Sequence, residues 1–367
     1  MRILYLDNVA SHYRKAIFLL MDKTYDIDYL FGKSLGDIKQ MDTSLLRGKV
    51  EKTKTRRFGG GWYWQPGLVG KLFKAYDRYL LVCETRALST WIFCLLAHLF
   101  GKSRKVYFWS HGWYGKETGL ERVIKKILFN LPKGGIFLYG NYARELMIKE
   151  GFKPEKLHTI HNSLDYDKQV ELRKIINPKP IYKEHFGNYN PNLFFVGRLT
   201  EVKKLDMVLR AMSLLRDRGQ QYNMTFIGDG TERESLEALS TELGLEQNVW
   251  FYGACYDEKV LGEMIYNADL CVAPGNIGLT AMHTLAYGTP ALTHDDFPHQ
   301  MPEFEAIREG ETGTFFQIGS DESLAGSIEN WFSNNGSRRE EVRRACMREI
   351  DEQWTPEFQI QVLQKYL

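Results

Sequence analysis

Short apolar runs alternate with segments of helical periodicity along the whole chain. The apolar runs are continuous, which is typical of strands buried on both faces of a parallel sheet. Strands are predicted at 2–6, 26–30, 79–83, 105–109, 135–139 and 157–160, and then at 193–196, 224–227, 249–252, 270–273 and 290–293. Helical patterns at 208–218, 233–243, 259–267 and 279–286 separate the later strands. The pattern predicts an α/β fold of two Rossmann-like, doubly wound parallel sheets, one in each half of the chain.

The length of 367 residues favours two domains, because single cores rarely grow past about 250–300 residues. We expect an N-terminal domain over 1–163 and a second domain over 164–345. Residues 346–367 should form a helical segment that packs back on the first domain. Ligands bind parallel sheets beyond the carboxyl ends of the strands, so the active site is expected in a cleft between the two domains.

The net charge of +2 hides a difference between the two halves. Residues 1–170 hold 29 Lys and Arg against 16 Asp and Glu, whereas residues 171–367 hold 19 against 30. Ordinary globular composition excludes disordered and low-complexity classes. Five cysteines without a C-x-x-C pair favour the reducing cytoplasm. The longest apolar stretch, 88–100, is too short to span a bilayer, which predicts a soluble or surface-bound protein.

One strand-loop-helix segment, 270–290, has the features of an anion site. Gly275, Asn276 and Gly278 stand in the loop, and the predicted helix begins at Leu279 and Thr280. Free N–H groups and the helix dipole attract phosphate at such a position. An ordinary connection would have the same pattern, and is the commoner case for a segment of this kind.

A second segment adds two cations. Arg198 follows the predicted strand 193–196, and Lys203 stands five residues later. Arginine and lysine both pair with phosphate oxygens, so together with the helix N–H groups they suit a diphosphate. The alternative is that both are solvated surface residues.

Six motifs follow one another between residues 195 and 313, and together they resemble a known family. They are Phe-Val-Gly-Arg-Leu-x3-Lys (195–203), Ile-Gly-Asp-Gly-x-Glu (227–232), Val-x-Phe-x-Gly (249–253), Ala-Asp-Leu (268–270), Ala-x-Gly-x-Pro (286–290) and Glu-x-Ile-x2-Gly-x2-Gly (305–313). The set is similar to GT-B retaining glycosyltransferases of family 4, of the bacterial polysaccharide type. The resemblance implies two Rossmann-like domains facing a central cleft, a nucleotide-sugar donor on the second domain, an acceptor on the first, and no metal or other cofactor.

By position, the resemblance implies a catalytic set of His111, Arg198 and Lys203. It implies donor contacts from a further set: Gly275, Asn276, Gly278, Leu279, Thr280, His283, Glu303 and Glu305. The family has two glutamates separated by seven residues, and here His283 replaces the second while Gly275 stands eight residues earlier. A neutral histidine accepts one hydrogen bond, so donor binding should weaken by about 1–2 kcal/mol.

The first half adds an acceptor side. His12 and Arg14 follow the first strand and are expected to contact the acceptor, a glycan or lipid-linked glycan. Residues 47–64 combine six basic residues with aromatics, and 117–129 form an amphipathic basic helix. Both segments suit peripheral contact with the anionic inner face of the cell membrane. A solvated loop at 47–64 and a core helix at 117–129 would give the same sequence pattern. No nucleic-acid motif accompanies the charge.

The sequence thus predicts a hexosyltransferase of cell-surface polysaccharide biosynthesis, such as lipopolysaccharide or capsule. Two alternatives remain open at this point. The missing glutamate pair is also compatible with a degenerate protein that binds sugar nucleotides or acts as a scaffold. A GT-B-fold sugar-nucleotide epimerase is the other.

Overall fold

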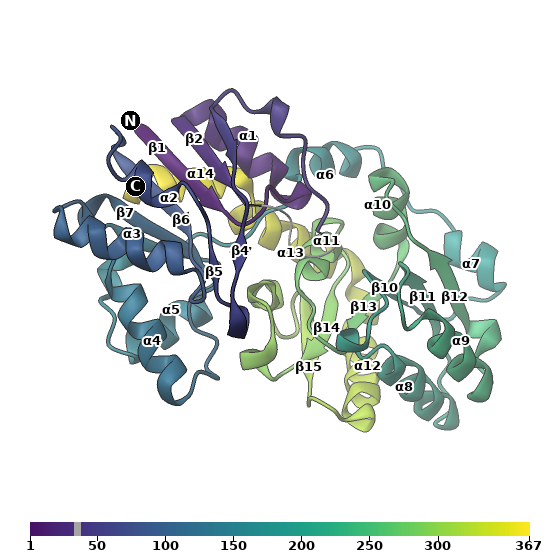
Figure 1. The fold of residues 1–367 in the computed structure, drawn as a ribbon. Coiled ribbons are helices and arrows are strands. Elements are labelled where there is room, and N and C mark those ends of the chain that lie inside the picture. The colour runs from purple at the N-terminus through teal and green to yellow at the C-terminus, as the bar shows by residue number, and fades with distance from the viewer. Residues whose placement is uncertain (33–37) are drawn as a thin grey trace. The chain divides into compact units, whose positions relative to one another are not determined.

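The computed structural model describes residues 1–32 and 38–367, which form two compact units. Unit 1 comprises Met1–Asp165 together with Thr355–Leu367, and unit 2 comprises Tyr166–Trp354. In Figure 1, unit 1 runs from purple to blue and includes the yellow helix α14 (Pro356–Tyr366). The helix α13 (Arg339–Gln353) lies wholly in unit 2, so the chain returns to unit 1 at Thr355 and not at residue 346.

Unit 1 is built on a seven-stranded, fully parallel sheet in the order β3-β2-β1-β6-β7-β8-β9. The strands are β1 (Arg2–Asp7), β2 (Asp26–Phe31), β3 (Val50–Lys52), β6 (Arg78–Val82), β7 (Val106–Ser110), β8 (Gly135–Leu138) and β9 (Leu157–Thr159). The central strands are almost entirely buried, which explains their continuous apolar runs. Strand order reverses between β1 and β6, as in a Rossmann sheet.

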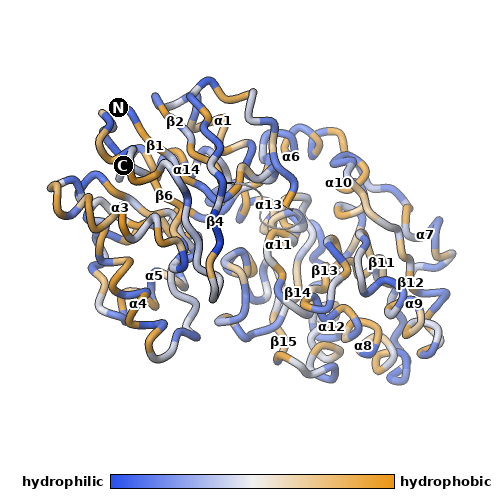
Figure 2. Tube along the Cα trace, viewed as in Figure 1, coloured by the Kyte–Doolittle hydropathy of each residue, from blue (hydrophilic) through white to orange (hydrophobic). Residues whose placement is uncertain are grey.

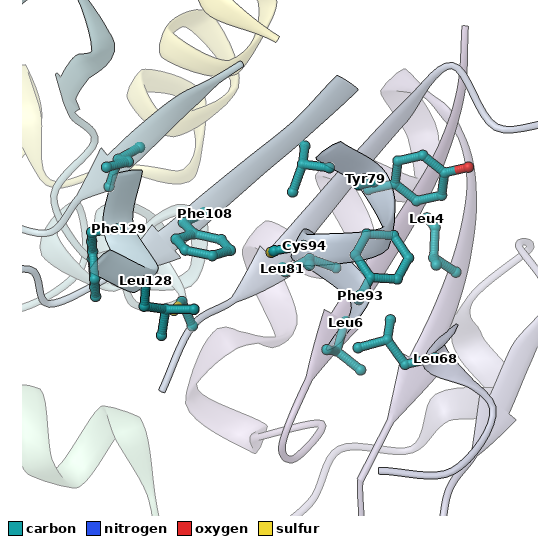
Figure 3. Close-up of a cluster of buried hydrophobic side chains, with 14 of the residues drawn as sticks. Leu4, Leu6, Leu68, Tyr79, Leu81, Phe93, Cys94, Phe108, Leu128 and Phe129 are labelled. Atoms are coloured by element: carbon teal, nitrogen blue, oxygen red, sulfur yellow. The ribbon is translucent and has the colours of Figure 1, made fainter. Parts of the chain in front are cut away.

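Helices cover both faces of this sheet. One face carries α2 (Leu68–Lys71), α3 (Leu88–Leu99), α4 (Gly119–Asn130) and α5 (Asn141–Lys149). Figure 3 shows its core, where Phe93 and Cys94 of α3 and Leu128 and Phe129 of α4 pack against strand residues such as Leu81 and Phe108. The other face carries α1 (Lys15–Thr24) and α14, whose Leu363 joins the buried cluster there.

The C-terminal helix is tied to unit 1 by polar contacts as well. Ser163 donates its hydroxyl to Oε1 of Gln359 over 2.7 Å, and the Gln359 amide donates to the His161 carbonyl. The ring of Tyr366 stacks on His158 at a centroid distance of 3.8 Å. These contacts explain why a segment so distant in sequence completes the first unit.

Unit 2 has a six-stranded parallel sheet in the order β12-β11-β10-β13-β14-β15. Its strands are β10 (Asn192–Val196), β11 (Asn223–Ile227), β12 (Val249–Gly253), β13 (Leu270–Ala273), β14 (Ala291–His294) and β15 (Gly313–Phe316). Its helices are α6 (Tyr166–Arg173), α7 (Ile181–Phe186), α8 (Asp206–Asp217), α9 (Arg233–Glu242), α10 (Glu258–Asn267), α11 (Leu279–Ala286), α12 (Asp321–Asn335) and α13. The order reverses between β10 and β13.

Two sheet-edge strands, β3 and β15, and a separate hairpin lie outside the predicted set. The strand β3 falls within the basic segment 47–64 and pairs in parallel with β2, Val50 opposite Tyr29. It has three residues, two of them charged, so no apolar run marks it. A short hairpin of β4 (Arg56–Arg57) and β5 (Tyr63–Trp64) follows. Over the described residues, every helix is too short or too polar to cross a membrane.

Candidate functional site

The main candidate site of unit 2 lies where the strand order reverses, at the carboxyl ends of β10 and β13. Arg198 stands two residues past β10, and Gly275 stands two residues past β13. Adjacent parallel strands on either side of a reversal leave a crevice, because their following helices cover opposite faces. The fold therefore brings together the two segments that the sequence singled out separately.

The two loops touch through their backbones. The Gly275 N–H donates to the Lys203 carbonyl over 2.9 Å. A Cβ at Gly275 would overlap the Val202 carbonyl oxygen, so only glycine fits. A Cβ at Gly228 would likewise overlap the carbonyl oxygen of Gly197, which precedes Arg198. Backbone contact at two places fixes where the loop carrying Arg198 and Lys203 begins and ends.

A buried glutamine holds the loop between β13 and α11. Gln300 accepts the Ile277 N–H over 3.0 Å and donates its amide to Thr293 Oγ1 over 2.8 Å. The Thr293 hydroxyl lies 2.8 Å from the Ala273 carbonyl and 3.2 Å from that of Gly275. Gln300 therefore holds the loop in place, and its side-chain oxygen and nitrogen are both engaged in hydrogen bonds there. The sequence offers one signal for it, the polar run that follows β14.

The helix α11 begins at this loop. Its N-cap Gly278 has φ 51°, a left-handed conformation that favours glycine. Thr280 anchors the first turn by donating its hydroxyl to the Val196 carbonyl over 2.8 Å, and its own N–H points to the Ile277 carbonyl at 3.3 Å. The N-terminus of α11 is thus tied to the end of β10, close to Arg198 in the chain.

Lys203 and Arg198 provide the positive charge. The Lys203 ammonium donates to the Asn276 carbonyl over 2.5 Å, which places it beside the glycine-bearing loop. Burial and the nearby Arg198 guanidinium lower the pKa of Lys203, while the Glu303 carboxylate opposes that shift. Arg198 is exposed to solvent. The pair gives a local positive patch in an acidic unit.

The other residues predicted to contact the donor, Glu303, Glu305 and His283, lie outside the two loops that carry Arg198, Lys203 and Gly275. Glu303 is buried in the turn Pro302–Ala306, whereas Glu305 in the same turn is half-buried. His283 lies in the last turn of α11, with its Nδ1 3.9 Å from Glu258 Oε1. Burial lowers the pKa of His283, and the Glu258 carboxylate opposes that shift. Glu258 itself accepts a 2.8 Å hydrogen bond from the Tyr287 hydroxyl.

Unit 1 has its own cavity of about 770 Å³ at the carboxyl ends of β6 and β7. His111 follows β7 and lines this cavity together with Trp62 and Tyr63. Arg86 and Lys125 add positive charge to the wall. The Lys125 ammonium pairs with Glu117 and lies 4.9 Å from the centre of the Trp113 ring. A cavity of this size and mixed lining suits a small polar ligand with apolar parts.

A hydrogen-bonded network that reaches the cavity wall was not predicted from the sequence. The Tyr63 hydroxyl lies 2.9 Å from Glu84 Oε2 and 3.2 Å from Asn8 Oδ1, and the Asn8 amide donates to Glu84 over 2.5 Å. Gln65 donates to the same Asn8 oxygen over 3.0 Å. No local motif links these residues: Tyr63 lies in β5, and Asn8, Gln65 and Glu84 follow the ends of β1, β5 and β6.

The predicted residues of unit 1 separate into two groups. Burial, and then the positive charges of Arg14 and Lys125, lower the pKa of His111 to about 4, so its ring is neutral near pH 7. Arg14 is buried: its guanidinium bonds to Asp7 over 2.7 Å and lies 4.6 Å from the Trp109 ring. His12 is exposed beside it. Neither His12 nor Arg14 lines the cavity that holds His111.

Sequence comparison places a known domain type in unit 2. Residues 181–347 match the family model of glycosyl transferases group 1. EpsD of Bacillus subtilis is 27% identical over 188 residues, which cover 50% of this chain and 47% of EpsD. A GDP-mannose-dependent alpha-(1-6)-phosphatidylinositol dimannoside mannosyltransferase of Mycobacterium tuberculosis is 33% identical over 103 residues, or 27% of this chain and 26% of that protein. The chain spans less than half the length of these relatives.

Solved structures establish the fold over the whole chain. HepE of Anabaena, solved in complex with UDP, gives a TM-score of 0.72 at 18% identity and covers 100% of this chain and 99% of HepE. The lipopolysaccharide outer core galactosyltransferase WaaB gives 0.72 at 15% identity, with both chains fully covered. The expected α/β fold of GT-B type is therefore confirmed, and its second unit is similar in sequence to group 1 glycosyltransferases.

Proposed function

We propose that this chain is a hexosyltransferase that moves a sugar from a nucleoside diphosphate sugar to a glycan or lipid-linked glycan. The proposal places it in bacterial surface polysaccharide assembly, with family 4 membership, retention of anomeric configuration and no required metal ion or other cofactor. One observation carries it: Arg198, Lys203 and the N-terminus of α11 converge at the strand-order reversal of unit 2. UDP is bound in the related HepE structure, and the mycobacterial relative uses GDP-mannose, which supports a nucleotide-sugar donor.

The diphosphate would leave with growing negative charge as the glycosidic bond breaks. Fixed donors and cations aimed at that charge stabilise the transition state more than the ground state. We assign Arg198 and Lys203 to the diphosphate oxygens, together with the N–H groups of Gly278 and Leu279. The Thr280 N–H already points to the Ile277 carbonyl, so we assign Thr280 to stabilising the turn and not to binding the diphosphate. Two side-chain cations supply the positive charge that a metal ion would otherwise bring.

The ribose and sugar contacts differ from the family pattern at two positions. His283 stands where the second glutamate is expected, and its lowered pKa keeps the ring neutral. Glu303 supplies a carboxylate near Lys203, and the half-buried Glu305 of the same turn is our assignment for the sugar hydroxyls. No carboxylate nucleophile is needed if the acceptor attacks the face from which the diphosphate departs.

The acceptor is assigned to the cavity of unit 1. Its neutral His111 can accept a hydrogen bond from a sugar hydroxyl, and Arg57 and Arg86 line the wall as partners for a phosphate group. A lipid-linked acceptor implies work at the cytoplasmic face of a membrane. Residues 47–64 and 117–129 would contact its anionic surface.

Calorimetric titration of UDP and GDP tests the donor assignment. Arg198→Ala should lose about 10- to 100-fold in affinity, since a charge-assisted hydrogen bond contributes about 1.5–3 kcal/mol. Lys204→Gln is the matched control, because it removes an exposed cation from the same loop. Equal affinities of wild type and Arg198→Ala for both nucleotides would reject the site.

Turnover separates the proposal from its alternatives. Nucleotide sugars incubated with a lipid-linked glycan extract should give product only when the acceptor is present. Binding without turnover would instead favour a degenerate sugar-nucleotide-binding or scaffold protein, and a changed sugar released without acceptor would favour an epimerase.

A further inference from the structure

The helix α3 of unit 1 is apolar on its outer face as well as its inner one. Phe93 and Cys94 point into the core, as Figure 3 shows. Ile92, Leu95 and Leu99 lie three and four residues apart, so they share the opposite, solvent-facing side. Phe100 and Phe73 extend this side, with their ring centres 5.3 Å apart. A surface helix normally has polar residues on its outer face, so the apolar outer face of α3 indicates an interaction site.

The neighbouring helix α4 repeats the feature. Leu128 and Phe129 enter the same buried cluster as Phe93, which puts α3 and α4 on one face of the sheet. Leu120, Val123 and Ile127 point outward. Figure 2 shows orange along both helices, at the left of the view. We call the eight outward side chains the α3–α4 surface: Phe73, Ile92, Leu95, Leu99, Phe100, Leu120, Val123 and Ile127, each between 42% and 75% exposed.

Positive charge accompanies this surface. Residues 86–133, which carry both helices, hold nine Lys and Arg against two Asp and Glu. Lys125 is paired with Glu117 and Arg122 with Glu150, whereas Arg104, Lys116 and Lys126 are exposed to solvent. Two copies of the chain meeting face to face would bring like charges together, which disfavours a dimer. Apolar side chains among cations instead match an anionic lipid surface, whose headgroups attract the charge and whose acyl region takes the apolar groups.

The cavity of unit 1 opens beside this surface. Leu120, Ile124 and Phe129 of α4 line the cavity, and Leu120 also belongs to the α3–α4 surface. A molecule held in a bilayer against α4 would therefore reach the cavity wall without crossing water. The basic segment 47–57 likewise has part of its charge engaged, since Arg47 bonds to Asp22 and Lys49 to Glu51, and it offers no comparable row of exposed apolar side chains.

We infer that the α3–α4 surface inserts into the headgroup region of an anionic bilayer and presents the unit 1 cavity to lipid-anchored molecules. The inference rests on the proposed function and deepens it, because it adds α3 to the membrane contact already proposed for 117–129 and gives the cavity a lipid-anchored ligand. The insertion depends chiefly on α3, whose apolar sequence is too short to span a bilayer but long enough to lie on one. The segment 47–57 adds only electrostatic attraction.

Vesicle flotation without donor or acceptor tests the contact. Wild type should float with vesicles of 30% phosphatidylglycerol in phosphatidylcholine, and part of this binding should survive 0.5 M NaCl. The double variant Leu95→Glu and Leu99→Glu should lose about tenfold or more of its partitioning, because two carboxylates enter an apolar contact. The single variant Ile127→Glu on α4 should lose less.

A matched control replaces two exposed apolar side chains elsewhere. Ile175→Glu with Ile318→Glu changes exposed isoleucines of unit 2, 58% and 47% exposed, and adds the same two negative charges. It should float like wild type. Circular dichroism and thermal unfolding check that each variant folds, and Ile127→Glu keeps the test decisive if the α3 variant does not.

The possible results distinguish a bilayer from a second copy of the chain as the partner of the α3–α4 surface. No flotation of wild type, or equal flotation of wild type and both folded surface variants, overturns the inference. A concentration-dependent dimer that the Leu95→Glu and Leu99→Glu change dissociates would assign the surface to a second copy instead. Failure of the proposed function looks different, because it leaves flotation intact while UDP and GDP fail to bind.

Discussion

The two candidate sites are built in different ways. In unit 2, backbone atoms make the site: Gly275 lies against the Val202 carbonyl, Gly228 lies against Gly197, and Gln300 holds the Ile277 N–H. In unit 1, side chains make it: His111, Tyr63, Arg86 and Lys125 line a cavity of about 770 Å³. Both sites lie at the carboxyl ends of strands near a reversal of strand order.

This difference predicts how each site responds to change. A backbone site depends on loop geometry, so a single added carbon can displace every donor at once. A side-chain site depends on charge and protonation, so it should tolerate shape changes better and respond more to pH. Substitutions in the two units therefore test the distinction directly.

Gly275→Ala should have the largest effect. Its Cβ would overlap main-chain atoms of Val202 and Lys203, which have no side-chain freedom with which to move aside. We expect a loss of about 2–4 kcal/mol in the free energy of unfolding and at least a tenfold loss of UDP affinity. Urea unfolding and calorimetry measure the two quantities.

Gly326→Ala is the control for that change. Gly326 lies inside α12, where an added Cβ meets no atom within 4 Å. Alanine should stabilise the helix by about 0.5–1 kcal/mol and leave UDP affinity unchanged. A Gly275→Ala protein as stable as wild type, with intact UDP affinity, would contradict the backbone description of the unit 2 site.

The strands β10 to β14 and the main loops of unit 2 were predictable because their signals are local, whereas the edge strand β15 was not predicted. The buried run 193–196, Arg198 and the glycines of 275–278 stand within short segments, and the parallel topology places such segments at one edge. Gln300 was harder, because its function follows from a hydrogen bond across 23 residues to Ile277. Sequence shows a polar residue there but not that it is buried.

Unit 1 was less predictable for the same physical reason. The network of Asn8, Tyr63, Gln65 and Glu84 joins residues up to 76 positions apart, and nothing in the local pattern links them. Arg14 was expected at the acceptor, yet it is enclosed by Asp7 and Trp109. A polar residue after a strand can point into the core when a buried carboxylate balances its charge.

Gln300→Ala should have an intermediate effect. Removing the amide leaves the Ile277 N–H buried without its acceptor, which costs about 1–3 kcal/mol in the free energy of unfolding. The loosened loop should reduce UDP affinity by about tenfold, equivalent to ~1.4 kcal/mol. His299→Ala is the neighbouring control, since its ring is exposed and its contact with Asp296 is worth little. Equal UDP affinities for the two variants would show that Gln300 does not position the loop.

Per pH unit, the pH response of His111 should be the smallest effect. Its folded pKa of about 4 lies below the 6.5 of an unfolded histidine. Between these values the unfolded chain binds a proton that the folded chain does not, so stability falls as the pH falls. The loss is at most ~1.4 kcal/mol per pH unit. His158, whose pKa burial also lowers to about 4, contributes in the same direction from outside the cavity.

Wild type should take up protons when it unfolds between pH 6.5 and 5, and His111→Asn should lower that uptake by up to one proton. The pH dependence of the urea unfolding midpoint measures the uptake. His158→Asn should lower the uptake in the same way without touching the cavity, which separates a stability effect from a ligand effect. The imidazole resonances of His111 should stay unchanged by NMR down to about pH 5. A midpoint for His111 near 6.5 would mean that its ring can be charged in the folded cavity. The charge of the His111 ring would then be set by solvent and not by burial. The unit 1 site would differ less from the unit 2 site than we propose.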